Sequence, residues 1–141
     1  YFFNSKRRDT RSYVTTWYGI KGSEEVIQMK VNVLDIGGDV IKDNETYVLK
    51  DNKTLNNLVL SSTDLKPGKS TMGHAHIGQE EVYYFVKGEG KMELISPNAE
   101  KTMHDVKPGS VVLIEDGFFH RVHAGKDGCY FVCVFDGKRN H

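Results

Sequence analysis

The stretch GHAHIGQEEVYYFVKGEG, residues Gly73–Gly90, joins a polar beginning to a strand-like continuation. Two histidines one residue apart and a pair of glutamates precede an aromatic and apolar run that ends on two glycines. The run VYYFV is rich in β-branched and aromatic residues, which favours a β-strand. Histidine and glutamate are poor choices for the start of a buried strand, because polar groups lose hydration on burial. Their presence here indicates a purpose other than packing.

The composition is that of an ordinary globular protein. The chain has 141 residues, which suits one domain with one core. Nineteen basic residues balance nineteen acidic ones, so there is no electrostatic reason to expect nucleic acid as a partner. The longest apolar runs are far shorter than the roughly 18 residues of a membrane span. We therefore expect neither nucleic acid nor a membrane among the partners.

The two cysteines, Cys129 and Cys133, lie in the strand-like run CYFVCVF. On a strand, at about 3.3 Å per residue, they would lie about 13 Å apart, too far for a disulfide with each other. Two thiols buried in a core are typical of a protein in a reducing compartment. The sequence therefore predicts a cytoplasmic protein.

Short strand-like runs dominate the sequence, and turn signals such as KPGK, KGEG, SPNAE, KPGS and GKDG separate them. We find no convincing helical stretch. Many short strands at this spacing are typical of an all-β sandwich or barrel. The predicted strands after the first 45 residues cover residues 46–50, 57–65, 82–88, 91–95, 100–106, 110–116, 119–124 and 129–135.

We interpret residues 1–45 as an N-terminal arm with strands, and residues 46–141 as the barrel. Within the arm, residues 24–36 (EEVIQMKVNVLDI) alternate apolar and polar side chains, which predicts a strand. Residues 13–20 (YVTTWYGI) add an aromatic segment. Because an exposed strand edge and an aromatic patch promote aggregation, we expect the arm to pack on the barrel or on a partner subunit. This predicts a homodimer.

Three histidines and one glutamate can meet at one point. Residues two apart on a strand point to the same side, so His74 and His76 would aim both imidazoles at one point. Glu81 begins the next strand, and His120 follows a turn late in the chain. Side chains that converge in this way can hold a single ion at about 2.0–2.2 Å. We therefore predict a metal site formed by these four residues.

The expected cofactor is one divalent transition metal. Mixed histidine and carboxylate ligation suits Fe, Mn, Ni or Zn, and the residue types do not choose among them. Four protein ligands on an octahedral ion leave two adjacent positions open. Such a site can chelate a vicinal hydroxy-carbonyl compound, an enediol, oxalate-like oxygens or dioxygen.

The remaining histidines have no place in this arrangement. His123 lies three residues after His120, so on a regular strand it faces away from the metal site. His104 lies in a polar strand, and His141 is terminal. We expect these three side chains to be solvated.

The spacing of these residues resembles the two sequence motifs of the cupins. The first motif is matched by Gly68, five residues, His74-Ala75-His76, four residues, Glu81, six residues and Gly88. The second is matched by Gly109, five residues, Glu115-Asp116-Gly117, two residues and His120. The resemblance implies a cupin jelly-roll barrel, or double-stranded β-helix, with the four ligands above. The interval to Gly88 favours Glu81 over its neighbour Glu80, which would then point outward.

Residues 66–121 are similar to the cupin-type sugar-phosphate isomerases, especially the phosphoglucose isomerases. The similarity lies in the segments PGKSTMGHAHIGQEEVYYFVKGEGKMEL and VKPGSVVLIEDGFFHR. It implies a reaction that interconverts an aldose and a ketose through a cis-enediol. It also implies that Thr71 and Gly73 help to hold a substrate phosphate and that Tyr83 contacts the sugar. In this reading the catalytic residues are Glu81, which would move a proton, and Tyr83, which would donate a hydrogen bond.

Three functions are compatible with such a cupin. The first is a metal-dependent enzyme that acts on a small oxygenated metabolite such as a sugar phosphate. The second is an Fe(II)-type dioxygenase or lyase, and the third is a non-catalytic cupin that binds a small ligand. Anaerobic isomerisation with several divalent ions would favour the first, dependence on dioxygen the second, and tight binding without turnover the third.

Overall fold

The computed structural model describes residues 28–138. Predictions that concern residues 1–27, among them the aromatic segment 13–20, lie outside this range. Over the described residues the chain forms seven β-strands and no helix. A helix able to cross a membrane is accordingly missing from this part of the chain.

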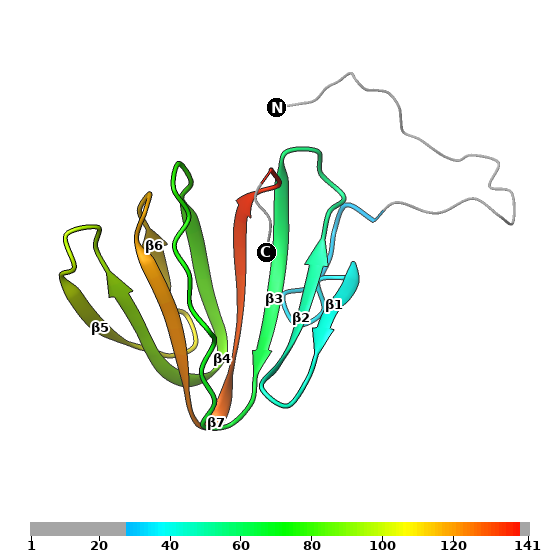
Figure 1. Cartoon of the computed structure of the whole chain (residues 1–141). Coiled ribbons are helices and arrows are strands. Elements are labelled where there is room, and N and C mark those ends of the chain that lie inside the picture. Colours follow the sequence, from blue (N-terminus) through cyan, green and yellow to red (C-terminus); the bar gives the residue numbers. More distant parts are fainter. Residues whose placement is uncertain (1–27, 139–141) are drawn as a thin grey trace, which may run out of the picture.

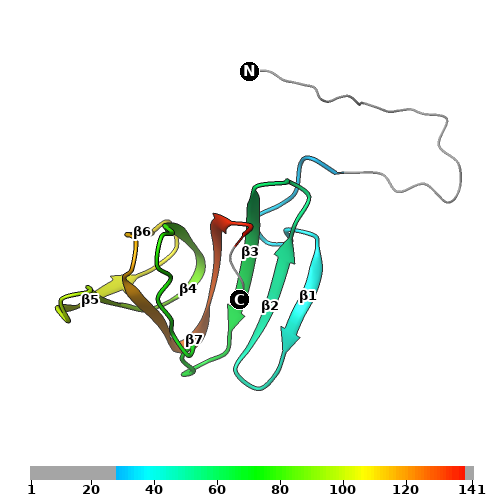
Figure 2. The same ribbon diagram turned by 45° about the horizontal axis from the view of Figure 1, so that its top comes forward.

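All paired strands are antiparallel, in the order β1-β2-β3-β7-β4-β5, and β6 pairs with the beginning of β4. Figures 1 and 2 show two groups of strands that diverge from a common corner. This is the double-sheet arrangement of a jelly roll, so the prediction of an all-β barrel is confirmed. The strands are β1 (Asp39–Asp43), β2 (Tyr47–Asn52), β3 (Leu58–Leu65), β4 (Glu81–Ile95), β5 (Lys101–Val106), β6 (Val111–Ile114) and β7 (Phe119–Asp136).

Strands β4 and β7 each join two of the predicted strands, because the chain bends where the sequence predicts turns. The turns predicted at residues 87–90 and 125–128 are wrong: both segments lie inside strands. The two strands stay paired there, and their register shifts twice over residues 85–90. Gly88 has a φ of 77°, and a Cβ on it would lie 2.1 Å from the carbonyl oxygen of Gly128. Glycine therefore lets two backbones approach closely at a bulge instead of ending the strands.

The bend places each long strand in both groups of strands. In Figure 1 the first half of β7, in orange, lies on the side of β5 and β6, and its red second half lies beside β3. The register agrees, since residues 129–136 of β7 pair with β3 while residues 119–124 pair with the part of β4 that carries β5. The barrel is thus closed by two continuous strands at its corner.

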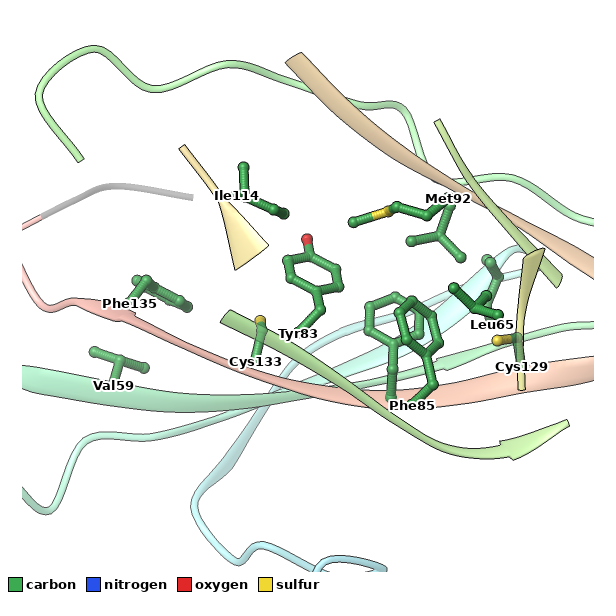
Figure 3. Packing of buried hydrophobic residues seen from close by; sticks show 12 residues of the cluster. Val59, Leu65, Tyr83, Phe85, Met92, Ile114, Cys129, Cys133 and Phe135 are labelled. Carbon is green, nitrogen blue, oxygen red and sulfur yellow. The ribbon is translucent and has the colours of Figure 1, made fainter. Parts of the chain in front are cut away.

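The hydrophobic core lies between the two groups of strands, near this corner (Figure 3). Phe85 and Phe131 are almost fully buried, and their ring centroids lie 5.1 Å apart. Buried and exposed side chains alternate along β4, where Phe85 is buried while Tyr84 is exposed. Neither Cys129 nor Cys133 forms a disulfide, and burial raises the pKa of the Cys129 thiol to about 11. Both cysteines are core residues, as the sequence predicts.

The strand predicted over residues 24–36 is wrong for its described part. From residue 28 to residue 36 only an isolated bridge forms, between Asn32 and Asp35. The side-chain oxygen of Asn32 accepts a hydrogen bond from the backbone of Leu34, and that of Asp35 accepts one from Gly37. Such local bonds stabilise turns in competition with a strand ladder.

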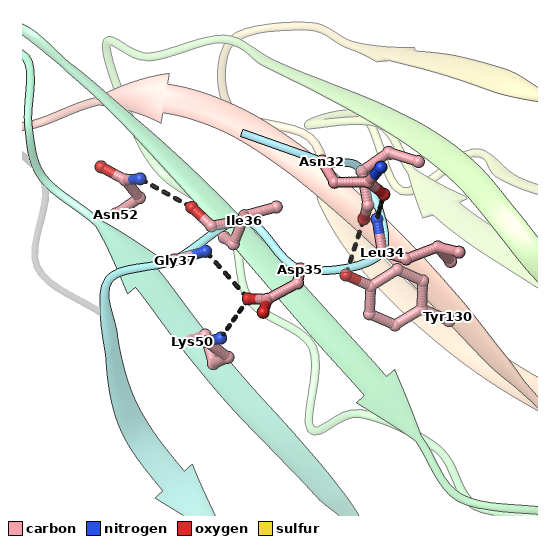
Figure 4. Close-up of polar contacts among 9 residues, drawn as sticks. Asn32, Leu34, Asp35, Ile36, Gly37, Lys50, Asn52 and Tyr130 are labelled. Carbon is pink, nitrogen blue, oxygen red and sulfur yellow. Dashed lines mark hydrogen bonds and ion pairs between the residues drawn. The ribbon is translucent and has the colours of Figure 1, made fainter. Parts of the chain in front are cut away.

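This turn segment is attached to the outer surface of the barrel (Figure 4). Asp35 pairs with Lys50 at 2.9 Å, and the Asn52 side chain donates a hydrogen bond of 2.7 Å to the carbonyl of Ile36. The Tyr130 hydroxyl donates one of 2.8 Å to the carbonyl of Val33. Residues 31–37 therefore cover part of the outer face of β2, β3 and β7.

Candidate metal centre

The segment between β3 and β4 carries His74 and His76. The expectation that both lie on a strand is wrong, because Gly73 and Gly78 have positive φ angles of 82° and 83° and interrupt an extended course. The segment is held to β7 instead: the backbone of His74 exchanges hydrogen bonds of 3.2 and 3.0 Å with the backbone of His120. This isolated bridge places His74 and His120 directly opposite each other.

Three of the predicted ligands converge. One ligand atom from each of His74, Glu81 and His120 lies within 4.8 Å of the others. Glu81 is the first residue of β4 and His120 the second of β7, so both lie at strand ends far from the corner. Their side chains are buried, whereas His74 is exposed. The group is therefore fixed on its inner side and reachable from solvent on its outer side.

The donor atoms of this group fit a metal ion. His120 Nδ1 lies 3.2 Å from the carbonyl oxygen of Phe118, which can only accept a hydrogen bond, so Nδ1 is the donor in this contact and Nε2 is the nitrogen that faces Glu81. That Nε2 is buried, makes no hydrogen bond within residues 28–138, and lies 3.1 Å from Glu81 Oε1. A spread of at most 4.8 Å is about twice the usual bond length from a metal to nitrogen or oxygen. One ion can therefore be shared by all three side chains.

His76 lies beside this group without belonging to it. Its ring centroid is 4.5 Å from that of His74 and 6.2 Å from that of His120. The two candidate glutamates differ clearly: Glu80 is exposed, whereas Glu81 is 4% exposed and faces the imidazoles. Gln79, which sequence reasoning did not single out, has a buried side-chain oxygen that accepts no hydrogen bond from the described residues.

Tyr83 supports the centre from the core side. Its ring is 7% exposed, stacks on Phe131 at 5.2 Å, and meets the ring of His120 edge-on at 5.7 Å. Figure 3 shows it projecting from β4 into the buried cluster, together with Phe85. The tyrosine therefore restrains the His120 imidazole by contact.

Thr71 and Gly73 hold the histidine segment against β7. The Thr71 backbone N–H donates to the carbonyl of Val122 at 2.9 Å, and its hydroxyl oxygen accepts from the Val122 N–H at 3.0 Å. Arg121 donates a further bond of 2.9 Å to the Thr71 carbonyl. At Gly73 a Cβ would lie 2.5 Å from the ring of Phe119. Thr71 and Gly73 thus fix the position of His74.

A second polar cluster, which the sequence did not reveal, fastens the same segment from outside. His123 Nδ1 lies 2.7 Å from the Ser70 hydroxyl, and Nε2 lies 2.7 Å from Glu93. The hydrogen bond to His123 lowers the pKa of the Glu93 carboxyl, and the Lys101 ammonium adds to this effect. The prediction that His123 is solvated is therefore wrong, since it is half-buried. No local signal marks the cluster, because its members are distant in sequence.

The other two histidines differ from His123. His104 is exposed, and its ring nitrogen lies 3.0 Å from the Thr102 hydroxyl. His141 lies outside the described residues.

The fold and the centre together define a jelly-roll barrel with converging histidine and glutamate side chains at strand ends far from its corner. The family model described as the cupin domain matches residues 61–135, just over half of the chain. The chain therefore belongs to the cupin family, which confirms the resemblance drawn from the two motifs.

Curated relatives agree with the more specific resemblance to the sugar-phosphate isomerases. The chain is 29% identical over 106 residues to the glucose-6-phosphate isomerase of Thermococcus litoralis and 30% identical to that of Pyrococcus horikoshii. Each alignment covers 69% of this chain and 56% of the relative. The chain thus spans little more than half the length of these relatives.

Solved structures share the fold. The chain is similar to an oxalate decarboxylase, with a TM-score of 0.69 and 23% identity over 83% of this chain and 32% of that one. It is also similar to KdgF from Halomonas sp., with a TM-score of 0.59 and 19% identity over 72% of this chain and 89% of that one. At these identities the likeness concerns the fold alone.

Proposed function

We propose that this cupin is a metal-dependent enzyme that interconverts the aldose and ketose forms of a sugar phosphate. The observation that carries the proposal is the convergence of His74, Glu81 and His120 within 4.8 Å. The substrate class comes from the relatives named glucose-6-phosphate isomerase. Because the chain spans 56% of these relatives, their activity is a hypothesis to be tested on this chain.

One divalent transition metal would be held by this group, with His76 as the fourth ligand. When bound, such an ion supplies Lewis-acid polarisation of a carbonyl group and a template for two substrate oxygens. The exposed side of His74 leaves a route for a small substrate. On the inner side, Glu81 and His120 are buried.

Aldose–ketose isomerisation moves a proton between two adjacent carbons, which requires a positioned base. We assign this role to the Glu81 carboxylate, because it is buried and fixed at the start of β4. Tyr83 would donate a hydrogen bond to a sugar hydroxyl, and its ring is held by Phe131 and His120. These two side chains would act on the reacting part of the sugar.

The substrate phosphate is assigned to Thr71 and Gly73. The Thr71 hydroxyl oxygen already accepts a bond from Val122, and its own hydrogen can still be donated to a phosphate oxygen. Gly73 offers a backbone without a Cβ directly beside His74.

The protein would work in the cytoplasm as a homodimer. The buried position of Cys129 and Cys133, neither in a disulfide, supports a reducing compartment.

The test begins with the metal content of the full chain, purified without chelators and measured by elemental analysis. Glucose 6-phosphate and fructose 6-phosphate are then offered under anaerobic conditions with Fe(II), Mn(II), Ni(II) or Zn(II). We expect isomerisation with more than one ion, and metal loss in the His120→Ala variant. The Glu81→Gln variant should lose turnover, while Glu80→Gln, its exposed neighbour, should keep it.

Other results would overturn parts of the proposal separately. Turnover that requires dioxygen, or decarboxylation of an organic acid, would assign the centre to an oxygenase or a lyase. Tight binding of a sugar phosphate without turnover would make this a binding protein. Full metal occupancy in a His74→Ala/His76→Ala double variant would discard the metal centre itself.

A further inference from the structure

Three side chains of the second polar cluster form one continuous chain of hydrogen bonds. The Ser70 hydroxyl lies 2.7 Å from His123 Nδ1, and His123 Nε2 lies 2.7 Å from Glu93 Oε1. A hydroxyl, an imidazole and a carboxylate in this order are the parts of a nucleophilic triad, in which the imidazole is the base and the carboxylate orients it. Such triads are recognised by their geometry and not by their order in the sequence. We call these three residues the outer triad.

The outer triad lies on the outside of the barrel, behind the candidate metal centre. On β7, His120 and Val122 point inward and are 3% and 1% exposed, so their alternate neighbour His123 points outward. On β4, Met92 is fully buried and Glu93 is its outward neighbour. The triad and the centre therefore lie on opposite faces of the same strands, and the isomerisation proposed above assigns no chemical step to the triad.

The backbone fixes the serine and the histidine as direct neighbours. Ser70 and His123 form an isolated antiparallel bridge, flanked by bonds of 2.9 and 2.8 Å between the backbones of residues 69–71 and 122–124. In such a pair the Cα atoms lie about 4.5 Å apart, which is the closest approach of side chains across a sheet. Glu93 reaches the imidazole diagonally from β4, two residues beyond the register partner of His123. The sheet itself thus holds the triad in place.

The hydrogen bonds determine which nitrogen of His123 is the base. The bond from His123 lowers the pKa of the Glu93 carboxyl, so this group is ionised at neutral pH. An ionised carboxylate only accepts hydrogen bonds, so Nε2 is the donor to Glu93. In the neutral imidazole, Nδ1 then has no proton and accepts the hydrogen of the Ser70 hydroxyl. The two nitrogens exchange the places that they have in the common serine triad, and each still performs one of its two tasks.

A small substrate can reach the outer triad, and a cation lies beside it. The His123 side chain is 31% exposed and Ser70 is half-buried, whereas the Glu93 side chain is 10% exposed. Arg121 is the register partner of Glu93, and its Nε donates a bond of 2.9 Å to the carbonyl of Thr71, the residue after Ser70. A guanidinium has further N–H donors and stays charged, so Arg121 can stabilise an oxyanion that develops next to Ser70.

We propose that the outer triad is a second active site, which hydrolyses small carboxylic esters without the metal centre. Ser70 Oγ attacks the carbonyl carbon of the ester while its proton moves to His123 Nδ1. The bond to the alkoxy oxygen then breaks, and this oxygen takes the proton and leaves as an alcohol. A water molecule attacks the acyl-serine with His123 again as the base, which releases the carboxylic acid and restores Ser70. Water is the only co-reactant, and the open, polar surroundings suit a small acyl group such as acetyl.

The first test identifies the nucleophile. The full chain is treated with a fluorophosphonate probe, whose phosphorus an activated serine hydroxyl attacks with loss of fluoride, and the labelled peptide is identified by mass spectrometry. We expect the label on Ser70, and labelling at least about 100-fold slower in His123→Ala. His104→Ala is the matched control: His104 lies 3.0 Å from the Thr102 hydroxyl, but no carboxylate of residues 28–138 is bonded to it. An unlabelled Ser70, or equal labelling in His123→Ala, overturns the proposal.

The second test measures the hydrolysis of p-nitrophenyl acetate by the full chain before and after treatment with a chelator. A bound metal can also activate water, so the activity of the triad is the part that the chelator leaves. We expect this part to fall at least about 100-fold in Ser70→Ala and at least about 10-fold in Glu93→Gln, which loses the orienting charge.

Two results of this second test would overturn the proposal. Hydrolysis that survives in a folded Ser70→Ala variant excludes Ser70 as the nucleophile. Hydrolysis that disappears entirely with the chelator assigns the reaction to the metal centre and leaves the proposed isomerisation untouched. Labelling of the natural sequence needs no variant, so the proposal stays testable even where Ser70→Ala fails to fold.

Discussion

Gly73→Ala should damage the histidine segment through two separable costs. The residue has a φ of 82°, which costs an alanine about 1–2 kcal/mol. The new Cβ would also lie 2.5 Å from Phe119 Cζ and 3.1 Å from Arg121 Cβ, so the ring must move by nearly an ångström. Overpacking of this kind costs about 1–3 kcal/mol. We expect a total loss of about 2–5 kcal/mol, measured by urea unfolding followed by circular dichroism.

Gly68→Ala is the matched control. Gly68 lies in the same segment with a φ of 70°, but nothing lies within 4 Å of the position of its Cβ. This variant should lower the free energy of unfolding only through the positive φ, by about 1–2 kcal/mol. Adding Phe119→Ala to Gly73→Ala should remove the steric part of the loss. Equal destabilisation by Gly73→Ala and Gly68→Ala would refute the reasoning, because the contact with Phe119 would then carry no cost.

Three further predictions concern the core, the outer cluster and the metal. Phe85→Ala should lower the free energy of unfolding by about 3–5 kcal/mol, because the ring is fully buried against Phe131; a loss below about 1 kcal/mol in urea unfolding would contradict this packing. Glu93 has a lowered pKa in the folded chain, so its contribution to stability is present above the ordinary carboxyl pKa and is lost as the pH falls through the folded pKa. The stability gap between the natural sequence and Glu93→Gln should therefore shrink between pH 6 and pH 3, and a constant gap would exclude the ion pair as its source. A divalent metal at 100 times its dissociation constant should stabilise the chelator-treated protein by about 2.7 kcal/mol, and His120→Ala should abolish most of this gain in a thermal melt, whereas His104→Ala should not.

The sequence predicts most of the strands, because inward and outward residues alternate along them. It misplaces the corners, where Gly88 and Gly128 have the appearance of turn residues. In the structure these glycines let β4 and β7 pass close together, a role that depends on a partner strand distant in sequence. Local patterns cannot distinguish a glycine that ends a strand from one that bends it. The same limit explains residues 28–36, whose alternation is real but whose hydrogen bonds are local.

The candidate site is predicted in its residue types and less well in its supports. Motif spacing selects His74, Glu81 and His120, and the interval to Gly88 favours Glu81 over Glu80. Motif spacing cannot predict the hydrogen bond between Ser70 and His123 that holds the histidine segment, because this bond joins residues more than fifty positions apart. The irregular course of the segment also depends on its bridge to β7, which no local pattern encodes.

The two continuous strands at the corner make correct strand pairing a condition for the assembly of the candidate metal centre. A slip of β4 by a single residue would turn Val82 inward and Glu81 outward, and the same slip would expose Phe85. Because β4 and β7 serve both groups of strands, such an error could not stay local. A chain that has paired its strands wrongly would therefore lose its core and the Glu81 carboxylate of the candidate centre together. Metal uptake would then be a measure of correct assembly of the whole barrel. Misassembled chains would bind no metal and would have no metal-dependent activity.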